Sequence, residues 1–516
     1  MHFSKAQFAE SMTARWKSLP NKKQLAILFF ARFVDVFQNT SLQTYIYYQL
    51  QSFQPESPDT TISTKIGWVL GIFAAAQALT ALIWARLADS KLFGRKNSLW
   101  VGLFGNCVSC VGIGVSKSFG QIACWRILAG TMNATGTIVT VMLAELVQEE
   151  ELQPHAFLLF TLAQNSAALI GPVIGSRSMN IAGTGENLQH LDNLMQNNLG
   201  FAFFTQFPFS MPNFLSAGLL MAAGFCVLFG LRETLNKEQS LDRGIPDVLT
   251  SANQAYVFNT MKIGEENAST RFGVWTKRMV LVLAAQASLD FHIAAFNHLW
   301  PVFLSTPSPA TDNAQAQTTK TRKVAGLGLS SSSVGFVIAM IGGIGLIGQI
   351  TLYSRMTIRF GSVKCYQWFS ILAPIAYALA PILALFSAPT VSTANHQPAT
   401  LWIGITVVLL FQVTGRVFSI PAAIVLLNSC VPHPSKLSTI HAIGMVVSSA
   451  FRTLGPISSG YIYSASSSVG NAILPWWTLS LVSLSGCVAL FVIPARCYEK
   501  AKIESAADSF EIQGLL

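Results

Sequence analysis

Charged residues are scarce in this chain. Asp, Glu, Lys and Arg make up 11% of its 516 residues, whereas a soluble globular protein carries about 25%. Hydrophobic residues account for 51%. The length alone would suggest several soluble domains, but so few charges do not suffice to cover their surfaces. The composition therefore excludes a multidomain soluble protein.

Sequence motifs of ATP-driven proteins and of enzymes are also absent. There is no phosphate-binding loop, so nothing indicates ATP as a driving force. No His/Cys cluster has metal-ligand spacing, and no nucleophile elbow is present. The eight cysteines are scattered and none lies in an expected external loop, which excludes a disulfide framework. The sequence predicts neither an enzyme nor a metal or cofactor site.

Long apolar blocks recur along the whole chain instead. About 18 consecutive apolar residues are enough to indicate a membrane-spanning helix. Twelve blocks qualify, with expected bounds 24–46, 64–85, 97–116, 120–144, 156–176, 211–231, 278–303, 331–353, 364–388, 400–427, 438–463 and 474–495. We therefore predict an all-α membrane protein with twelve transmembrane helices.

The distribution of basic residues predicts the orientation. An even number of spans places both ends of the chain on one side, and Lys and Arg concentrate in both tails, in the loop after span 2 and after span 6. Because cytoplasmic loops are enriched in Lys and Arg, both termini are predicted to be cytoplasmic. The net charge of +10 follows from this asymmetry and does not indicate nucleic-acid binding. The first apolar block begins near Gln24 and is long enough to remain as a span, so we expect no cleaved signal peptide.

The two halves of the chain resemble each other. Landmarks recur at similar spacing, namely Arg126 and Arg416 in spans 4 and 10, and Gly171-Pro172 and Gly455-Pro456 in spans 5 and 11. This repetition indicates two pseudo-symmetric six-helix halves, typical of transporters whose halves move around a site at the middle of the membrane. The expected division is a cytoplasmic tail 1–23, an N-terminal half 24–231, a cytoplasmic central loop 232–277, a C-terminal half 278–495 and a cytoplasmic tail 496–516.

The charged stretch "ADSKLFGRK" between spans 2 and 3 is a recognisable motif. It resembles the G-x-x-x-D-R-x-G-R-K signature of the major facilitator superfamily through Asp89, Gly94, Arg95 and Lys96, with two more residues before the glycine. Span 1 resembles that of fungal twelve-span drug:proton antiporters, and "LRETL" after span 6 is similar to a short acidic motif of the same group. Two further matches are the span 4 pattern through Arg126, Gly130 and Asn133, and the antiporter signature of span 5 through Gly171, Pro172 and Gly175.

The resemblance implies roles for these residues. Asp89 would lock the two halves in an outward-facing state through Arg95 and a helix end of span 11. The glycines and proline of span 5 would form a tight contact with span 8 that closes one gate. The counterpart of Arg126 faces the central cavity and is linked to proton coupling. The fold implied is the twelve-helix major facilitator fold.

Charges inside the spans are the candidate functional residues, because each costs roughly 2.5 kcal/mol or more in a bilayer. Arg32 and Asp35 lie one helical turn apart. Either they form a salt bridge that hides both charges, or Asp35 takes up a proton and loosens the pair. Arg126 either acts in the cavity, where it would attract an anion, or extends its side chain to the membrane surface.

Span 7 and span 10 add candidates in the second half. Asp290 shares a helix face with His298, eight residues on, whereas His292 lies off that face. A histidine there could relay protons or fill a packing position. Arg416 is the span 10 counterpart of Arg126. Arg452, in span 11, is the fourth intramembrane arginine.

These patterns predict a proton-coupled secondary transporter that exports small organic molecules, such as drugs, toxins or secondary metabolites, by alternating access. Asp35 is the expected proton group, with Arg32 and Arg126 beside it. One alternative is proton-coupled uptake, or vacuolar loading, of a nutrient or organic anion; another is a non-transporting receptor or scaffold. We expect a monomer in the plasma membrane, or else the vacuolar membrane, driven by the proton gradient without a cofactor. Its partners are a small-molecule substrate, protons and the lipid bilayer.

Overall fold

The computed structural model of the chain describes residues 20–90, 93–147, 153–179, 203–204, 206–235, 276–306, 326–386, 398–428, 437–468 and 473–493. Most of the expected N-terminal tail and central loop, and all of the expected C-terminal tail, lie outside these residues. Within them every regular element is a helix. This agrees with the membrane setting, where a backbone must satisfy its hydrogen bonds inside its own segment.

The N-terminal half contains six spanning segments. They are α2 (Lys22–Phe53), α3 (Asp59–Asp89), α4 (Gly94–Gly114), the pair α5 (Phe119–Met132) and α6 (Thr135–Leu146), α7 (Gln153–Met179), and α10 (Ser210–Phe225) continued by η2 (Cys226–Gly230). The fourth segment is interrupted at Asn133, whose amide side chain is used by the site described below.

The C-terminal half repeats this arrangement. Its segments are α12 (Lys277–Ser305); α13 (Ser331–Ile347), η5 (Gly348–Tyr353) and α14 (Ser354–Phe360); α15 (Ser362–Ser370), α16 (Leu372–Leu379), η6 (Ala380–Ile382) and α17 (Leu383–Phe386); α18 (Ala399–Asn428); α19 (Leu437–Ser468); and α20 (Leu474–Val492). Only Gly361 separates α14 from α15, with φ of 82°, a conformation that glycine adopts without steric cost.

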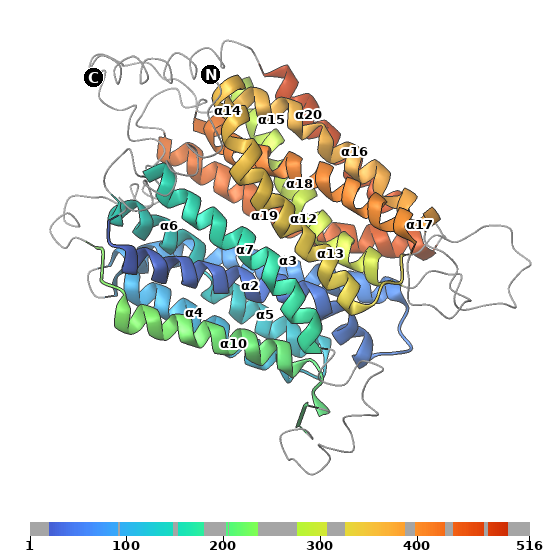
Figure 1. Ribbon diagram of the computed structural model, residues 1–516, viewed down its shortest axis with the longest axis horizontal. Helices are drawn as coiled ribbons and strands as arrows, with labels where there is room; N and C mark the ends of the chain where they lie inside the picture. The colour runs from blue at the N-terminus through green and yellow to red at the C-terminus, as the bar shows by residue number, and fades with distance from the viewer. Residues whose placement is uncertain are drawn as a thin grey trace, which may run out of the picture.

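The predicted fold is confirmed. The twelve segments coincide with the twelve expected spans, although α2 and α3 extend several residues beyond the expected bounds. Within the described residues, nine of the segments are long and apolar enough to cross a membrane by length and composition. Figure 1 shows the blue-to-green helices of the first half and the yellow-to-red helices of the second half as two groups side by side.

Glycine contacts show the symmetry of the halves at atomic detail. A Cβ added at Gly171 of α7 would lie 3.0 Å from Phe37 O of α2, and one at Gly455 of α19 would lie 2.7 Å from Phe291 O of α12. Span 5 therefore packs on span 1 as span 11 packs on span 7. Only residues without a side chain permit such close helix contact.

The two halves join along α3 with α19 and along α7 with α13. A Cβ at Gly67 of α3 would lie 2.5 Å from Pro456 O of α19, and one at Gly335 of α13 would lie 2.8 Å from Pro172 O of α7. The halves are therefore in backbone contact at two symmetry-related places.

We call the end where α2 begins and α20 ends the terminal end, and the opposite end the distal end. Hydrogen bonds join the halves at the distal end. Tyr48 donates to Leu329 O at 3.0 Å, and Trp68 Nε1 donates to the Tyr461 hydroxyl at 3.1 Å. The hydrophobic clusters follow the same division. One distal cluster draws buried residues from both halves, whereas the two clusters toward the terminal end belong to one half each. The halves are thus joined at the distal end and packed separately at the terminal end.

Candidate functional site

Asp35 lies at the centre of a buried polar cluster in the N-terminal half. Arg32 Nη1 lies 2.6 Å from Asp35 Oδ2, so the salt bridge considered from the sequence is present. Asn133 Nδ2 donates to Asp35 Oδ1 at 2.8 Å. The residue Asp35 is 3% exposed. Its two carboxylate oxygens are held by side chains of different spans. A change in its charge would therefore act on the packing of α2 against the interruption between α5 and α6.

Arg126 is held within the same half. Its Nη1 donates to Asn39 Oδ1 at 3.3 Å, its Nε donates to Val69 O at 3.4 Å, and its guanidinium lies 4.1 Å from the ring centroid of Phe73. Asn39 in turn donates to Asp35 O at 3.0 Å. Arg126 is thus buried between α2 and α3 and connected to Asp35 through one asparagine, so its charge is partnered by dipoles and a ring rather than by an acid.

Gly130 explains why α5 can bring its polar groups so near α2 and α3. A Cβ at Gly130 would lie 2.4 Å from Phe73 O. The glycine of the span 4 pattern is therefore a close-contact position, whereas Asn133 of the same pattern is the hydrogen-bond donor to Asp35. Asn39 belongs to the span 1 motif, but its role as a link was not identified from the sequence.

In the C-terminal half the expected residues do not form one cluster. Asp290 Oδ2 accepts from Gln286 Nε2 at 2.7 Å, and His292 Nδ1 lies 2.8 Å from the Tyr377 hydroxyl. His298 lies toward the distal end instead, where its Nε2–H donates to Ser63 O across the two halves at 2.9 Å. A carbonyl can only accept, which identifies Nε2 as the protonated nitrogen. His298 is therefore a contact between the halves, which favours its packing interpretation over a relay with Asp290.

Arg416 lines a small polar hollow inside the C-terminal half. The hollow has a volume of about 20 Å³ and is also lined by His292, Gln412 and Ser483. That volume accommodates about one water molecule. The buried oxygens Gln412 Oε1 and Ser483 Oγ have no hydrogen-bond partner within the described residues. Arg416 thus matches Arg126 in its position within the helix, but the groups around the two guanidinium groups differ.

Arg452 lies close to charged residues of both halves. This residue lies near the middle of α19, and its side chain is exposed. Its charge is close enough to interact with Arg32 of the first half and with Asp290 and Arg416 of the second. Arg452 therefore brings the otherwise separate groups of α2, α12 and α18 into one charged layer, defined as Arg32, Asp35, Asp290, Arg416 and Arg452.

The terminal end of the N-terminal half carries a second ionic network. Arg95 Nη2 lies 3.3 Å from Asp89 Oδ1, and Arg95 Nη1 also contacts Glu145 Oε2. All three residues belong to the first half. The pair of Asp89 with Arg95 that the resemblance implies is thus present, whereas the expected link to the start of span 11 stays a prediction. The first side chains of α19 and residues 91–92 lie outside the described side chains.

Glu233 completes this network from the "LRETL" segment. Its carboxylate accepts from the backbone N–H groups of Arg95 at 3.2 Å and Lys96 at 3.0 Å. An acid is favoured at a helix N-terminus, where free N–H groups leave a partial positive charge. Gly94 begins α4 with φ of 75°, and a Cβ there would lie 2.4 Å from Glu233 Oε2. The glycine of the loop signature thus makes room for the carboxylate that caps the next helix.

We expect Glu233→Ala to lower the stability of the purified protein by about 0.5–2 kcal/mol, the usual effect of removing a helix cap. Thermal unfolding in detergent measures the change. The matched control is Lys96→Met, because Lys96 uses only its backbone N–H in this contact. Equal unfolding midpoints for Glu233→Ala and the unmodified chain would contradict a capping role.

The glycines of span 5 have a different partner from the one that the resemblance implies. Gly171 and Gly175 face α2, where an added Cβ would lie 2.5 Å from Thr40 Oγ1 and 2.4 Å from Ser41 Oγ. The contact of α7 with α13 exists, but the close-approach glycines belong to α13. The close contact between spans 5 and 8 is therefore made by the glycines of span 8, because the glycines of α7 face span 1.

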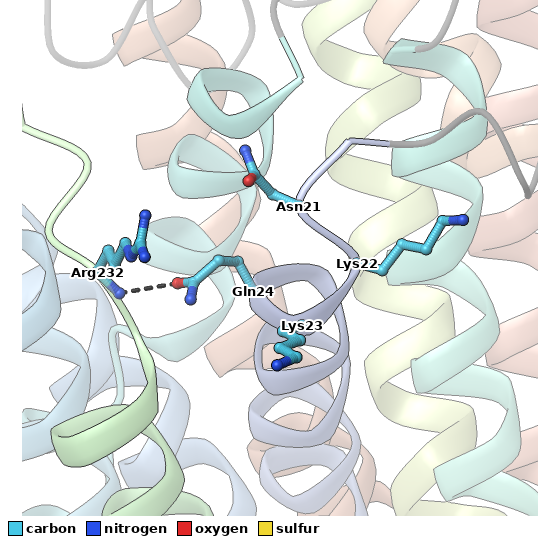
Figure 2. A pocket seen from close by; sticks show the side chains of 5 residues that line it. All are labelled: Asn21, Lys22, Lys23, Gln24 and Arg232. Carbon is cyan, nitrogen blue, oxygen red and sulfur yellow. Dashed lines mark hydrogen bonds between the residues drawn. The ribbon is translucent and has the colours of Figure 1, made fainter.

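A larger hollow lies away from the charged layer, at the start of α2. It has a volume of about 370 Å³ and is lined by Asn21, Lys22, Lys23, Gln24 and Arg232. Figure 2 shows the hydrogen bond from the Arg232 backbone N–H to Gln24 Oε1 that joins the end of the first half to its beginning. This hollow is at the terminal surface, and its lysines point in different directions, so it is separate from the candidate site.

Comparison with known proteins gives consistent matches. The profile described as Major Facilitator Superfamily matches residues 25–308. The chain is 24% identical to a major facilitator superfamily multidrug transporter, mfsB, of Aspergillus fumigatus, over 94% of this chain and 86% of that protein. It is 22% identical to a probable peptide/nitrate transporter of Arabidopsis thaliana, over 88% of each chain. Among solved structures, the human organic anion transporter MFSD10 is similar with a TM-score of 0.56, at 14% identity, over 91% of this chain and 99% of that chain.

Proposed function

The chain belongs to the major facilitator superfamily, and from that premise we propose that it exports small organic molecules in exchange for protons. It is a multi-pass integral membrane transporter of small molecules. Export is proposed because the fungal relative at 24% identity is described as a multidrug transporter. The first-span motif and the span 5 signature support the same direction.

The observation that carries proton coupling is the position of Asp35. Its carboxylate is buried between α2 and the interrupted fourth span and is held by Arg32 and Asn133. Protonation would remove the charge that pairs with Arg32 and would weaken both contacts. Arg32 would then interact more strongly with other groups of the charged layer. Because a ligand shifts a two-state equilibrium only through a difference in affinity between the states, these contacts would differ between the protonated and unprotonated carrier.

The conformation fits one state of an alternating-access cycle. The halves are joined at the distal end by His298, Tyr48 and Trp68. With the termini cytoplasmic, as the basic residues predict, this state would be open toward the cytoplasm, ready to take up cargo for export. We propose that the carrier acts as a monomer in the plasma membrane, performs no catalysis and needs no cofactor, since the proton gradient would supply the free energy.

Transport by reconstituted protein tests this proposal. The purified chain in liposomes, screened against fluorescent drugs with an imposed pH gradient, should move cargo against the direction of proton flow, and collapse of the gradient by a protonophore should stop accumulation. Cargo that accumulates on the side to which protons flow would instead establish uptake. Transport at the same rate with and without a gradient would refute proton coupling.

A further inference from the structure

The interior of the spans contains more arginine than acid. Four arginines lie in the interior of the spans, at positions 32, 126, 416 and 452, against two aspartates at positions 35 and 290. Two of the arginines have partners in the protein. Arg32 pairs with Asp35, and Arg126 is held by two hydrogen bonds and an aromatic ring. The two arginines for which the described residues show no hydrogen bond or ion pair therefore belong to the C-terminal half.

Arg416 and Arg452 are these two arginines. Within the described part of the chain, neither guanidinium makes a hydrogen bond or an ion pair, and they are close enough to repel each other. Asp290 interacts with Arg452, but it is also held by Gln286. A single carboxylate cannot neutralise two guanidinium groups. Two cations near the middle of spanning helices are expensive unless an anion joins them.

Arg452 is also accessible. Its side chain is exposed, although it lies between α2 of one half and α12 and α18 of the other. The halves pack as separate clusters toward the terminal end, so a ligand would approach Arg452 from that end. An arginine that is accessible, lies at a central position and makes no hydrogen bond or ion pair within the described residues is suited to bind a ligand, because its planar N–H donors match the oxygens of a carboxylate or a related anion.

Two aromatic rings lie at the same height along α12 and α19 as Asp290 and Arg452. Phe451 adjoins Arg452 in α19, and Phe291 adjoins Asp290 in α12; their ring centroids are 6.5 Å apart at an interplanar angle of 70°. Both side chains are partly exposed. A flat apolar group could contact these rings while an anionic group reached Arg452. The site thus combines a positive and an aromatic surface.

We propose that the cargo is an amphipathic aromatic anion whose acidic group binds Arg452 and Arg416 and whose apolar body contacts Phe291 and Phe451. This proposal rests on the proposed function, since it names the substrate class of the same carrier. It also divides the roles of the halves. The first half holds the proton group, and the second half recognises the negative charge of the cargo.

Equilibrium binding to the purified full-length protein, without a pH gradient, tests the proposal. The probes are 1-naphthoate and 1-naphthamide, which share a ring system and differ in charge. The unmodified protein should bind naphthoate at least tenfold more tightly than naphthamide. Arg452→Gln should abolish this preference by weakening naphthoate alone, and Arg452→Lys should retain part of it. Arg355→Gln, which removes an exposed arginine of α14, should leave the preference unchanged.

Several outcomes would overturn the proposal. They are equal affinity for both probes, undetectable binding of naphthoate, and a preference that survives in both Arg452→Gln and Arg416→Gln. The two single variants, each checked by its thermal unfolding curve, keep the test valid if one of them fails to fold. A charge preference without gradient-driven transport would refute the proposed function but not this inference. Gradient-driven transport without a charge preference would refute only the inference.

Discussion

Asp35→Asn should abolish transport driven by a pH gradient while leaving exchange of cargo across the membrane intact. Asparagine has the same shape as aspartate and still hydrogen-bonds Asn133, but it cannot release a proton. Exchange of labelled for unlabelled cargo requires the carrier to change conformation without net proton movement. We expect gradient-driven accumulation to fall at least tenfold, and exchange to change much less.

The removal of Asp35 alone leaves Arg32 buried without its partner, which typically costs about 3–5 kcal/mol. The double variant Arg32→Gln/Asp35→Asn removes both charges and separates loss of folding from loss of coupling. Glu56→Gln is the matched control, because Glu56 is an exposed acid outside the spans. If the double variant folds and still accumulates cargo in response to a pH gradient, Asp35 is not the coupling group.

Gly342→Ala should disrupt the joined distal end. An added Cβ would lie 2.4 Å from Leu169 N and 2.5 Å from Ala168 C. Both are backbone atoms of α7, so α13 must move away, and overpacking of this kind costs about 1–3 kcal/mol. Since the contact joins the two halves, this cost falls on the conformation closed at the distal end. Each 1.4 kcal/mol changes the ratio of two states tenfold, which should raise the population open at the distal end.

The adjacent glycine supplies the control for this prediction. A Cβ at Gly343 would lie 3.5 Å from Leu169 Cδ1, an ordinary contact, so Gly343→Ala should behave as the unmodified chain. The measurement is labelling of Ser63→Cys by a membrane-impermeant maleimide, with the exposed Cys124 and Cys226 replaced by serine. Ser63 is fully buried in the distal contact. Equal labelling rates in the Gly342→Ala and Gly343→Ala proteins would contradict the prediction. They would show that α13 accommodates the added methyl group without destabilising the conformation closed at the distal end.

The presence and order of the helices were predictable from the sequence. The contacts between residues of different helices were not. The twelve spans follow from apolar length, a local property that the bilayer imposes on each segment separately. The Arg32–Asp35 pair was also accessible, since residues three apart lie on one helix face. By contrast, the bonds from Asn133 to Asp35 and from Glu233 to the start of α4 join residues about a hundred or more positions apart, and no local pattern indicates them. The motifs identified these residues as important, but they did not show which residue each of them contacts.

The sequence by itself determined a twelve-helix membrane protein with two similar halves and a few charges in its interior, because hydrophobic length and repeated landmarks are properties of the chain. Only the tertiary structure decided what each charge does. The packing of helices from distant parts of the chain neutralises Arg32, holds Arg126 with dipoles, places His298 in the distal contact and leaves Arg452 accessible between the halves. The cost of an unpartnered charge in a bilayer depends on its surroundings, and those surroundings exist only once the helices have packed.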